Sequence, residues 1–270
     1  MAKAAKLDTD GQVMTALARG IEVLRCFSPI ETELSSKQLA EKTGLPKPTL
    51  FRITSTLRTL GLLRYDEARS SFLLAPGVLA LAAPVLARLT LRQVARPLMQ
   101  QLADYADAHL MISMGAARDL VVVETVLGAQ SAVFRPEIGA RVSLSRSAVG
   151  RVYLLSLSTA EREAHIRRVA AADKERAKHL QTALNVNAND LARYGYCKAF
   201  GEVRREVWGV AAPMGTQFDG QTIVFSCSVL PFTADEALLD DLGNRLVSLV
   251  HTVEAALGNA DHLGPLHFEL

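Results

Sequence analysis

Cysteine is scarce in this chain of 270 residues, and its three cysteines, Cys26, Cys197 and Cys227, lie far apart. They form no CxxC pair, so they imply neither a disulfide framework nor a zinc knuckle, and they indicate a reducing cytoplasm. The six histidines have no metal-ligand spacing, and the GxSxG, HExxH, P-loop and GxGxxG motifs are missing. We therefore expect no enzyme activity, no cofactor and no metal site.

Long hydrophobic runs are also missing. The most apolar stretch, residues 73–91, is broken by Pro76, Gly77, Pro84 and Arg88, and the first residues lack the apolar core of a signal peptide. We therefore expect a soluble protein with no membrane partner. Hydrophobic residues still make up 49% of the chain, which is enough for the cores of two domains or of one large one.

Neither sign of charge dominates, because the chain contains 30 Lys and Arg and 28 Asp and Glu. The distribution is uneven, however. Residues 1–75 hold 11 Lys and Arg against 8 Asp and Glu, a net charge of +3, whereas residues 76–270 have a net charge of −1. The mild positive excess lies in the N-terminal part, where contact with nucleic acid would need it.

Two short helices joined by a tight turn are predicted in this positive part. Ser35 or Ser36 can cap the first helix, and Gly44 can end it in the left-handed conformation. Pro46 and Pro48 fall in the turn and in the first turn of the next helix, where a missing N–H group does no harm. This pattern is typical of a helix-turn-helix.

The second helix, after Pro46, has two different faces. Leu50, Ile53, Leu57 and Leu60 have the spacing of one buried stripe. The opposite face combines long cations with small hydroxyls, which suits a helix in a DNA major groove, although a solvated helical hairpin is the ordinary alternative. The residues that we expect to contact DNA are Ser36, Lys47, Thr49, Phe51, Arg52, Ser55, Arg58 and Arg69.

The residues after this helix favour the DNA-binding interpretation. Gly61 ends the helix, and two short strands, residues 62–65 and 71–74, follow around a polar turn at residues 66–70. Two helices followed by a hairpin with a basic tip make a winged helix-turn-helix.

Two further helices are expected around this motif. A helix over residues 13–27 would pack Leu17, Ile21, Leu24 and Phe27 beneath the helix-turn-helix. The Ala- and Leu-rich residues 77–89 predict a connecting helix that is too apolar to be solvated. We expect a second copy of the chain to cover it, and packing within one chain is the alternative.

Residues 91–258 predict helices that flank an antiparallel sheet, which is an α+β fold. Helices are expected over residues 91–108 (Val94, Leu98, Leu102 and Tyr105 inward), 145–157, from a capping box at Ser158, 174–193 with a break at 185–187, and from a capping box at Thr233 (Leu238, Leu242, Leu246, Leu249 and Val253 inward). Strands are expected over residues 110–114, 119–126, 132–134, 207–213 and 222–230.

Several segments together resemble the IclR family of bacterial transcriptional regulators. They are LARGIEVL at residues 17–24, QLAEKTGLPKPT at 38–49, SAVGRVYL at 147–154, YGY at 194–196, GVAAPM at 209–214 and FSCS at 225–228. We expect a disordered N-terminus (1–12), a winged helix-turn-helix domain (13–75), a linker helix (76–90), an α+β domain (91–258) and a C-terminal tail (259–270). The resemblance implies that the α+β domain is a GAF-like effector-binding module. It also implies a homodimer or homotetramer.

The resemblance further implies a small organic acid as effector. The residues that match the family's pocket are Ala148 and Val149 in a helix-opening loop, Ala199, Gly209, and the strand serines Ser226 and Ser228. Some relatives have an acidic residue at the position of Ala199 and a cysteine at that of Gly209. We therefore expect a larger or more apolar effector, such as an aromatic acid. The alternative is that the serines only satisfy neighbouring strand residues.

The pattern as a whole predicts a ligand-responsive, DNA-binding transcriptional regulator of catabolic genes, with a double-stranded DNA operator and a small-molecule effector as partners. The alternative is an enzyme or a protein-binding scaffold with an accessory winged helix. Such a scaffold would not need five cations, Lys47, Arg52, Arg58, Arg64 and Arg69, over the second helix and the wing.

Overall fold

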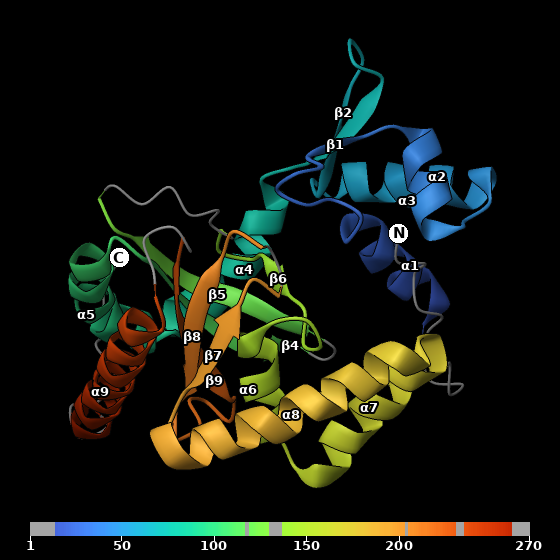
Figure 1. Ribbon diagram of the computed structural model, residues 1–270. Helices are drawn as coiled ribbons and strands as arrows, with labels where there is room; N and C mark the ends of the chain where they lie inside the picture. The colour runs from blue at the N-terminus through green and yellow to red at the C-terminus, as the bar shows by residue number, and fades with distance from the viewer. Residues whose placement is uncertain (1–13, 117–118, 130–136, 203–204, 231–234, 261–270) are drawn as a thin grey trace. The chain divides into compact units, whose positions relative to one another are not determined.

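The computed structural model describes residues 14–116, 119–129, 137–202, 205–230 and 235–260, and it divides the chain into two compact units at Arg88 and Leu89 (Figure 1). The N-terminal unit contains α1 (Thr15–Leu24), β1 (Glu33–Leu34), α2 (Ser36–Thr43), α3 (Lys47–Thr59), β2 (Leu63–Asp66), β3 (Ser71–Leu74) and α4 (Gly77–Arg88). The predicted strand at residues 132–134, like the ends of the chain, lies outside the described residues.

The helix-turn-helix forms where the local signals predict it. Ser35 caps α2, since its Oγ accepts a hydrogen bond from the Gln38 N–H while the Gln38 side chain accepts one from the Ser35 N–H. Gly44 ends α2 with a φ of 67°, a conformation that costs little without a Cβ. Pro46 and Pro48 lie at the N-cap and in the first turn of α3, as expected.

The core of this unit differs in detail from the predicted one. Its buried apolar residues are Val23, Phe27, Leu34, Leu39, Leu50, Leu57, Leu63 and Phe72. Leu17 and Ile21 are exposed, because α1 packs through the side that carries Val23. Leu60 is exposed as well, because it follows the last turn of α3 as its C-cap. Thr54 is buried instead, with its hydroxyl satisfied by the Leu50 carbonyl oxygen at 3.0 Å.

The wing is a three-stranded antiparallel sheet in the order β1-β3-β2. The hairpin of β2 and β3 confirms the sequence prediction. The two-residue strand β1 was not predicted.

Among the described residues of its own unit, helix α4 has no partner that buries any of its residues. Leu79, Leu81 and Val85 are 73%, 66% and 57% exposed. Packing against the described residues of this unit therefore does not cover the helix. Among the described residues no single helix is long and apolar enough to cross a membrane, and only the broken pair of α4 and α5 reaches the necessary length and composition.

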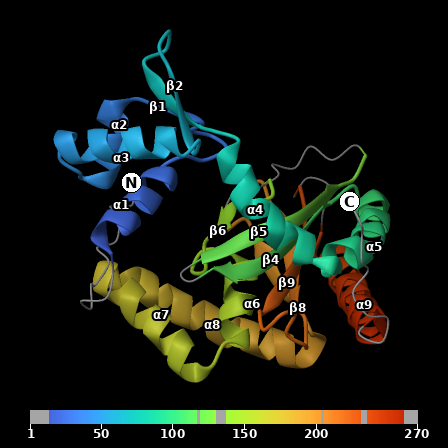
Figure 2. The ribbon, with the colours of Figure 1, turned by 180° about the vertical axis from the view of Figure 1, so that it is seen from behind.

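The C-terminal unit is built on a six-stranded antiparallel sheet, which confirms the α+β class. Its strands are β4 (His109–Ala116), β5 (Asp119–Leu127), β6 (Arg141–Val142), β7 (Cys197–Phe200), β8 (Trp208–Pro213) and β9 (Ile223–Val229), in the order β6-β5-β4-β9-β8-β7. Its helices are α5 (Thr90–Ala106), α6 (Ala148–Ser156), α7 (Thr159–Ala172), α8 (Lys174–Tyr194) and α9 (Glu236–Ala260). Helices α5 and α9 cover one face of the sheet, and α6 and α8 lie on the other (Figures 1 and 2).

Several predictions for this unit are wrong in detail. Tyr105 is exposed, because α5 packs through Leu91, Ala95, Met99 and Leu102, and the Tyr105 ring lies beneath the Arg245 guanidinium, 4.0 Å from it. Helix α8 has no break at residues 185–187, since Asn187 is buried and its side chain bonds to Arg151. The short strands β6 and β7 were not predicted.

The capping boxes had different outcomes. The box at Ser158 opens α7 as predicted. Thr233 lies outside the described residues, and α9 begins at Glu236, where the Asp235 carboxylate accepts a hydrogen bond from the Leu238 N–H at 2.8 Å. Leu239 is fully buried at the start of α9, whereas Leu238 is half-buried.

Candidate DNA-binding and effector-binding sites

The solvent-facing side of α3 carries the side chains predicted to contact DNA. Lys47, Phe51, Arg52 and Arg58 are exposed, Phe51 by 72%, and Ser55 is half-buried beside them. Within the described part of the chain, neither Lys47 nor Arg52 forms an ion pair. Cations without intramolecular partners on one helix face can bind phosphate groups.

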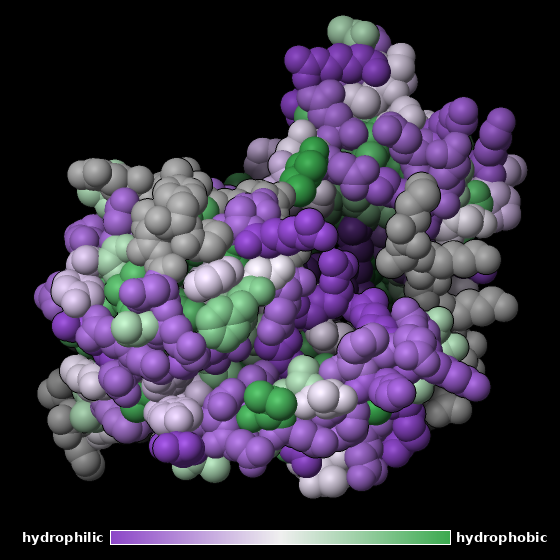
Figure 3. All heavy atoms as spheres, in the orientation of Figure 1, coloured by the Kyte–Doolittle hydropathy of each residue, from purple (hydrophilic) through white to green (hydrophobic). Residues whose placement is uncertain are grey.

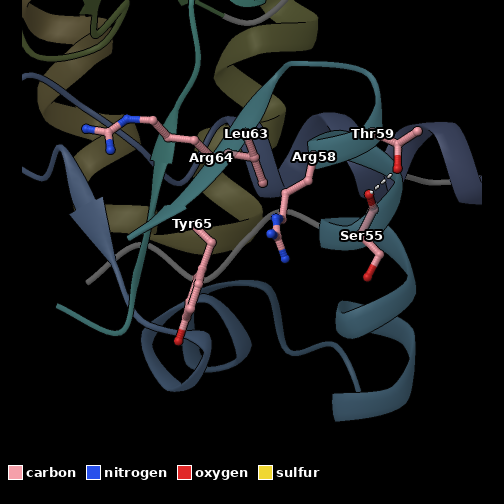
Figure 4. A pocket seen from close by; sticks show the side chains of 6 residues that line it. All are labelled: Ser55, Arg58, Thr59, Leu63, Arg64 and Tyr65. Carbon is pink, nitrogen blue, oxygen red and sulfur yellow. Dashed lines mark hydrogen bonds between the residues drawn. The ribbon is translucent and has the colours of Figure 1, made fainter. Parts of the chain in front are cut away.

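A hollow of about 560 Å³ lies between α3 and strand β2 of the wing (Figure 4). It is lined by Ser55, Arg58 and Thr59 of α3 and by Leu63, Arg64 and Tyr65 of β2. The Arg58 guanidinium extends into this space toward the Tyr65 ring. Tyr65 was not expected at this surface, although its place beside Arg64 on the basic wing was a signal for it.

The remaining predicted DNA contacts differ in their surroundings. Ser36 is exposed in the first turn of α2, and Thr49 is half-buried. Arg69 lies in the wing turn and pairs with Glu33 at the start of β1. Its charge is therefore partly neutralised within the chain, unlike the charges of Lys47 and Arg52.

The sheet of the C-terminal unit brings together the four predicted effector residues that lie on strands. Ala199 of β7 pairs with Gly209 of β8, which pairs with Ser228 of β9, so the three form one row across the sheet. Ser226 lies opposite Ala211, two residues along β9 from Ser228. Residues directly opposite each other in antiparallel strands, and residues two apart along a strand, project from the same face.

The other two predicted effector residues, Ala148 and Val149, open α6 above the same face. Both are buried, and they belong to one apolar cluster with Ala211 and Val224 of the sheet. Ser147 caps the helix by accepting a hydrogen bond from the Gly150 N–H at 2.9 Å. The unpaired N–H groups of a helix N-terminus favour an anion such as a carboxylate.

Gly209 does not provide the extra space that the sequence suggested. A Cβ atom at this position would lie 2.5 Å from the Cys227 carbonyl oxygen and 3.1 Å from the Ser228 hydroxyl. The close approach of β8 to β9 is therefore a structural reason for the glycine. The role of Gly209 in the effector pocket stays a prediction.

An open hollow of about 700 Å³, lined mostly by charged and polar residues, lies between the start of α6 and helix α8, a region where Figure 3 shows many hydrophilic side chains. Arg151 of α6 borders it and is only 4% exposed. Its Nε donates to the Asn187 Oδ1 at 2.5 Å, and its Nη1 pairs with Glu202. These bonds fix Arg151 as a structural link between α6, α8 and the residues after β7.

His109, Cys197 and Cys227, the other residues near the proposed pocket, are buried and packed within the C-terminal unit. His109 is buried, with its Nε2 2.7 Å from the Thr125 Oγ1. Burial raises the pKa of the Cys197 and Cys227 thiols to about 12, so both stay protonated. No group of three or more His, Cys, Asp or Glu among the described residues could hold a metal ion.

Comparison with known proteins identifies both units. The IclR helix-turn-helix domain matches residues 16–67, and the bacterial transcriptional regulator IclR C-terminal domain matches residues 83–249. The HTH-type transcriptional regulator TsaQ1/TsaQ2 of Comamonas testosteroni is 30% identical over 247 residues, which cover 90% of this chain and 88% of that protein.

Solved structures have the same fold. An IclR family transcriptional regulator from Brucella abortus is 38% identical, with a TM-score of 0.80 over 94% of this chain and 97% of that one. An IclR homologue from Microbacterium hydrocarbonoxydans, solved in complex with 4-hydroxybenzoate, is 20% identical, with a TM-score of 0.70 over 91% of this chain and 100% of that one.

Proposed function

The chain belongs to the IclR family of bacterial transcriptional regulators, and on this basis we propose which of its surfaces bind DNA and effector. It is a ligand-responsive, DNA-binding transcription regulator. We propose that α3 and the wing bind a double-stranded operator, and that the α6-facing side of the sheet binds a small organic or aromatic acid. We also propose that the protein works in the cytoplasm on catabolic genes and has no enzyme activity of its own.

The exposed face of α3 is the observation that carries the DNA-binding part. Lys47 and Arg52 are exposed and form no ion pair with any residue that the structure describes, and Arg58 extends into the hollow beside the wing. A test is to select binding sequences from a pool of random DNA duplexes with the wild type, Arg52→Ala, and the control Arg168→Ala. Arg168 is an exposed cation of α7.

We expect the wild type and Arg168→Ala to enrich the same sequence and Arg52→Ala to enrich it weakly or not at all. Equal enrichment by Arg52→Ala would show that this face of α3 does not bind DNA.

The start of α6 and the serine-bearing strand β9 support the effector site. The helix start provides backbone N–H groups, and the strand provides hydroxyls beside the small residues Ala199, Gly209 and Ala211. Benzoate, 4-hydroxybenzoate and pyruvate are suitable first compounds, since one solved relative of the same fold holds 4-hydroxybenzoate. An acid that binds only the native state raises the melting temperature. Ligand binding that survives deletion of the C-terminal unit would contradict this placement.

The exposed apolar residues of α4 support a homodimer, alone or as half of a tetramer. Leu81 and Val85 are one helical turn apart and therefore share a side of the helix. We expect light scattering to give a dimer or tetramer for the wild type and a smaller mass for the double variant Leu81→Lys, Val85→Lys. An unchanged mass would show that another surface joins the copies.

A further inference from the structure

Two buried serine hydroxyls in the C-terminal unit have no hydrogen-bond partner among the described residues. They belong to Ser113 on β4, which is fully buried, and to Ser226 on β9, which is 3% exposed. Buried hydroxyl groups nearly always have a hydrogen-bond partner. A buried hydroxyl without one has lost its hydrogen bonds to water and has gained none in the protein, which costs free energy. Ser113 matches none of the motifs that pointed to the effector site.

The strand register places both hydroxyls on one face. Ser113 pairs with Val224, and Ser226 follows two residues later on β9, so the two serines are diagonal neighbours. This face turns toward α6. Gly115, two residues beyond Ser113, lies so close to Tyr153 of α6 that an added Cβ would collide with the tyrosine hydroxyl.

The rows of the two serines across the sheet contain no Lys or Arg. Val122, Val224 and Pro213 lie beside Ser113, and Cys197, Ala211, Met111 and Thr125 lie beside Ser226. His109 lies in the neighbouring row, where its Nε2 is 2.7 Å from the Thr125 Oγ1. A carboxylate buried in the two serine rows would have no Lys or Arg opposite it, which is costly. A neutral hydroxyl can donate a hydrogen bond to one serine and accept one from the other.

We propose that Ser113 and Ser226 together bind a neutral hydroxyl group of the effector, while its carboxylate lies at the N-terminus of α6. This inference rests on the proposed effector site and narrows its ligand to a hydroxylated acid. Ser113 is then a specificity-determining residue, because an effector without the hydroxyl group would leave both serines unpaired.

Calorimetric titration with benzoate and 4-hydroxybenzoate tests the inference, since the two acids differ only in the hydroxyl group. The variants are Ser113→Ala, Ser226→Ala and the control Ser71→Ala. Ser71 is also buried with a hydroxyl that has no partner among the described residues, but it lies in the wing. We expect the wild type to prefer 4-hydroxybenzoate and Ser113→Ala to lose about fivefold of that preference, the usual effect of one hydrogen bond. Ser71→Ala should bind both acids like the wild type.

Melting curves without ligand separate binding from folding. Ser113→Ala should melt at or slightly above the wild-type temperature, because it removes an unpaired hydroxyl rather than a hydrogen bond. An unchanged preference in Ser113→Ala would overturn the role of Ser113 and leave the proposed effector site standing. If the wild type binds neither acid, the proposed effector class falls together with this inference.

Discussion

The guanidinium carbon of Arg58 on α3 lies 5.7 Å from the centre of the Tyr65 ring on β2, which joins the second helix of the helix-turn-helix to the wing. The Tyr65 ring also packs against Phe72 at 4.9 Å, and Phe72 belongs to the buried core. The core therefore orients Tyr65, and Tyr65 orients a cation on the proposed DNA-binding face.

Replacing Tyr65 tests this orientation. Tyr65→Leu should weaken operator binding by about twofold to fivefold, the equivalent of one exposed cation–π contact, whereas Tyr65→Phe should keep most of the affinity. Fluorescence anisotropy on the selected operator measures both, and melting curves check that the core survives. In a double-mutant cycle, Arg58→Ala should reduce the operator affinity by a smaller factor in the Tyr65→Leu background than in the wild type. Strictly additive effects would mean that the ring does not orient the arginine.

Alanine variants of Lys47 and Arg52 should show whether each of these α3 cations contacts a phosphate group or a base. If Lys47 or Arg52 binds a phosphate, its alanine variant should reduce the slope of log affinity against log salt by about one unit, for all sequences alike. If it reads a base, the loss should be about 1–3 kcal/mol and concentrated at one base pair. Affinity titrations at several salt concentrations distinguish the two cases. The Arg168→Ala control should change neither the slope nor the sequence preference.

The helix-turn-helix could be predicted from the sequence because its signals are local. The cap at Ser35, the left-handed Gly44, and the prolines at the N-cap and in the first turn of α3 each act within a few residues of the element that they shape. The two-residue strands β1 and β6 carry no periodic pattern, since they exist only through their partners β3 and β5. These strands therefore form through contacts between segments that are distant in the sequence, which local patterns do not reveal.

The candidate effector site depended even more on distant contacts. The pairing of Ser226 with Ala211 and of Ser113 with Val224 depends on strand register, which no local pattern specifies. The predicted break in α8 failed for a similar reason. Asn187 is a poor helix former, but its hydrogen bond to Arg151, 36 residues earlier, holds it inside the helix.

The buried His165 of α7 should make stability depend on pH. Its Nε2 lies 3.0 Å from the Ser145 Oγ, and its Nδ1 has no hydrogen-bond partner among the described residues. Burial lowers its pKa, Arg168 and Arg176 lower it further, and Asp119 opposes them. The unfolded chain therefore binds a proton more readily than the folded one below the ordinary pKa of about 6.5.

Stability from this group should be fully present above pH of about 6.5 and should fall as the pH drops below that value. Melting temperatures of the wild type and His165→Asn between pH 7.5 and 5.0 measure the effect. The variant should lose less stability on acidification. His179→Asn, at an exposed position of α8, is the control and should follow the wild type. An equal loss in all three proteins would assign the acid sensitivity to other groups.

The last prediction concerns Gly209. The sequence suggested that this glycine leaves room for the effector, whereas the structure suggests that it allows β8 to pack closely against β9. A Cβ atom there would lie 2.5 Å from the Cys227 carbonyl oxygen, so even Gly209→Ala must push β8 away from β9. We expect a loss of about 1–3 kcal/mol in the free energy of unfolding, measured by urea denaturation. Gly258→Ala is the control, since a Cβ atom at Gly258 on α9 would meet nothing within 4 Å, and its stability should stay equal or rise slightly. A Gly209→Ala variant with wild-type stability and impaired ligand binding would instead support the view that this position shapes the effector pocket.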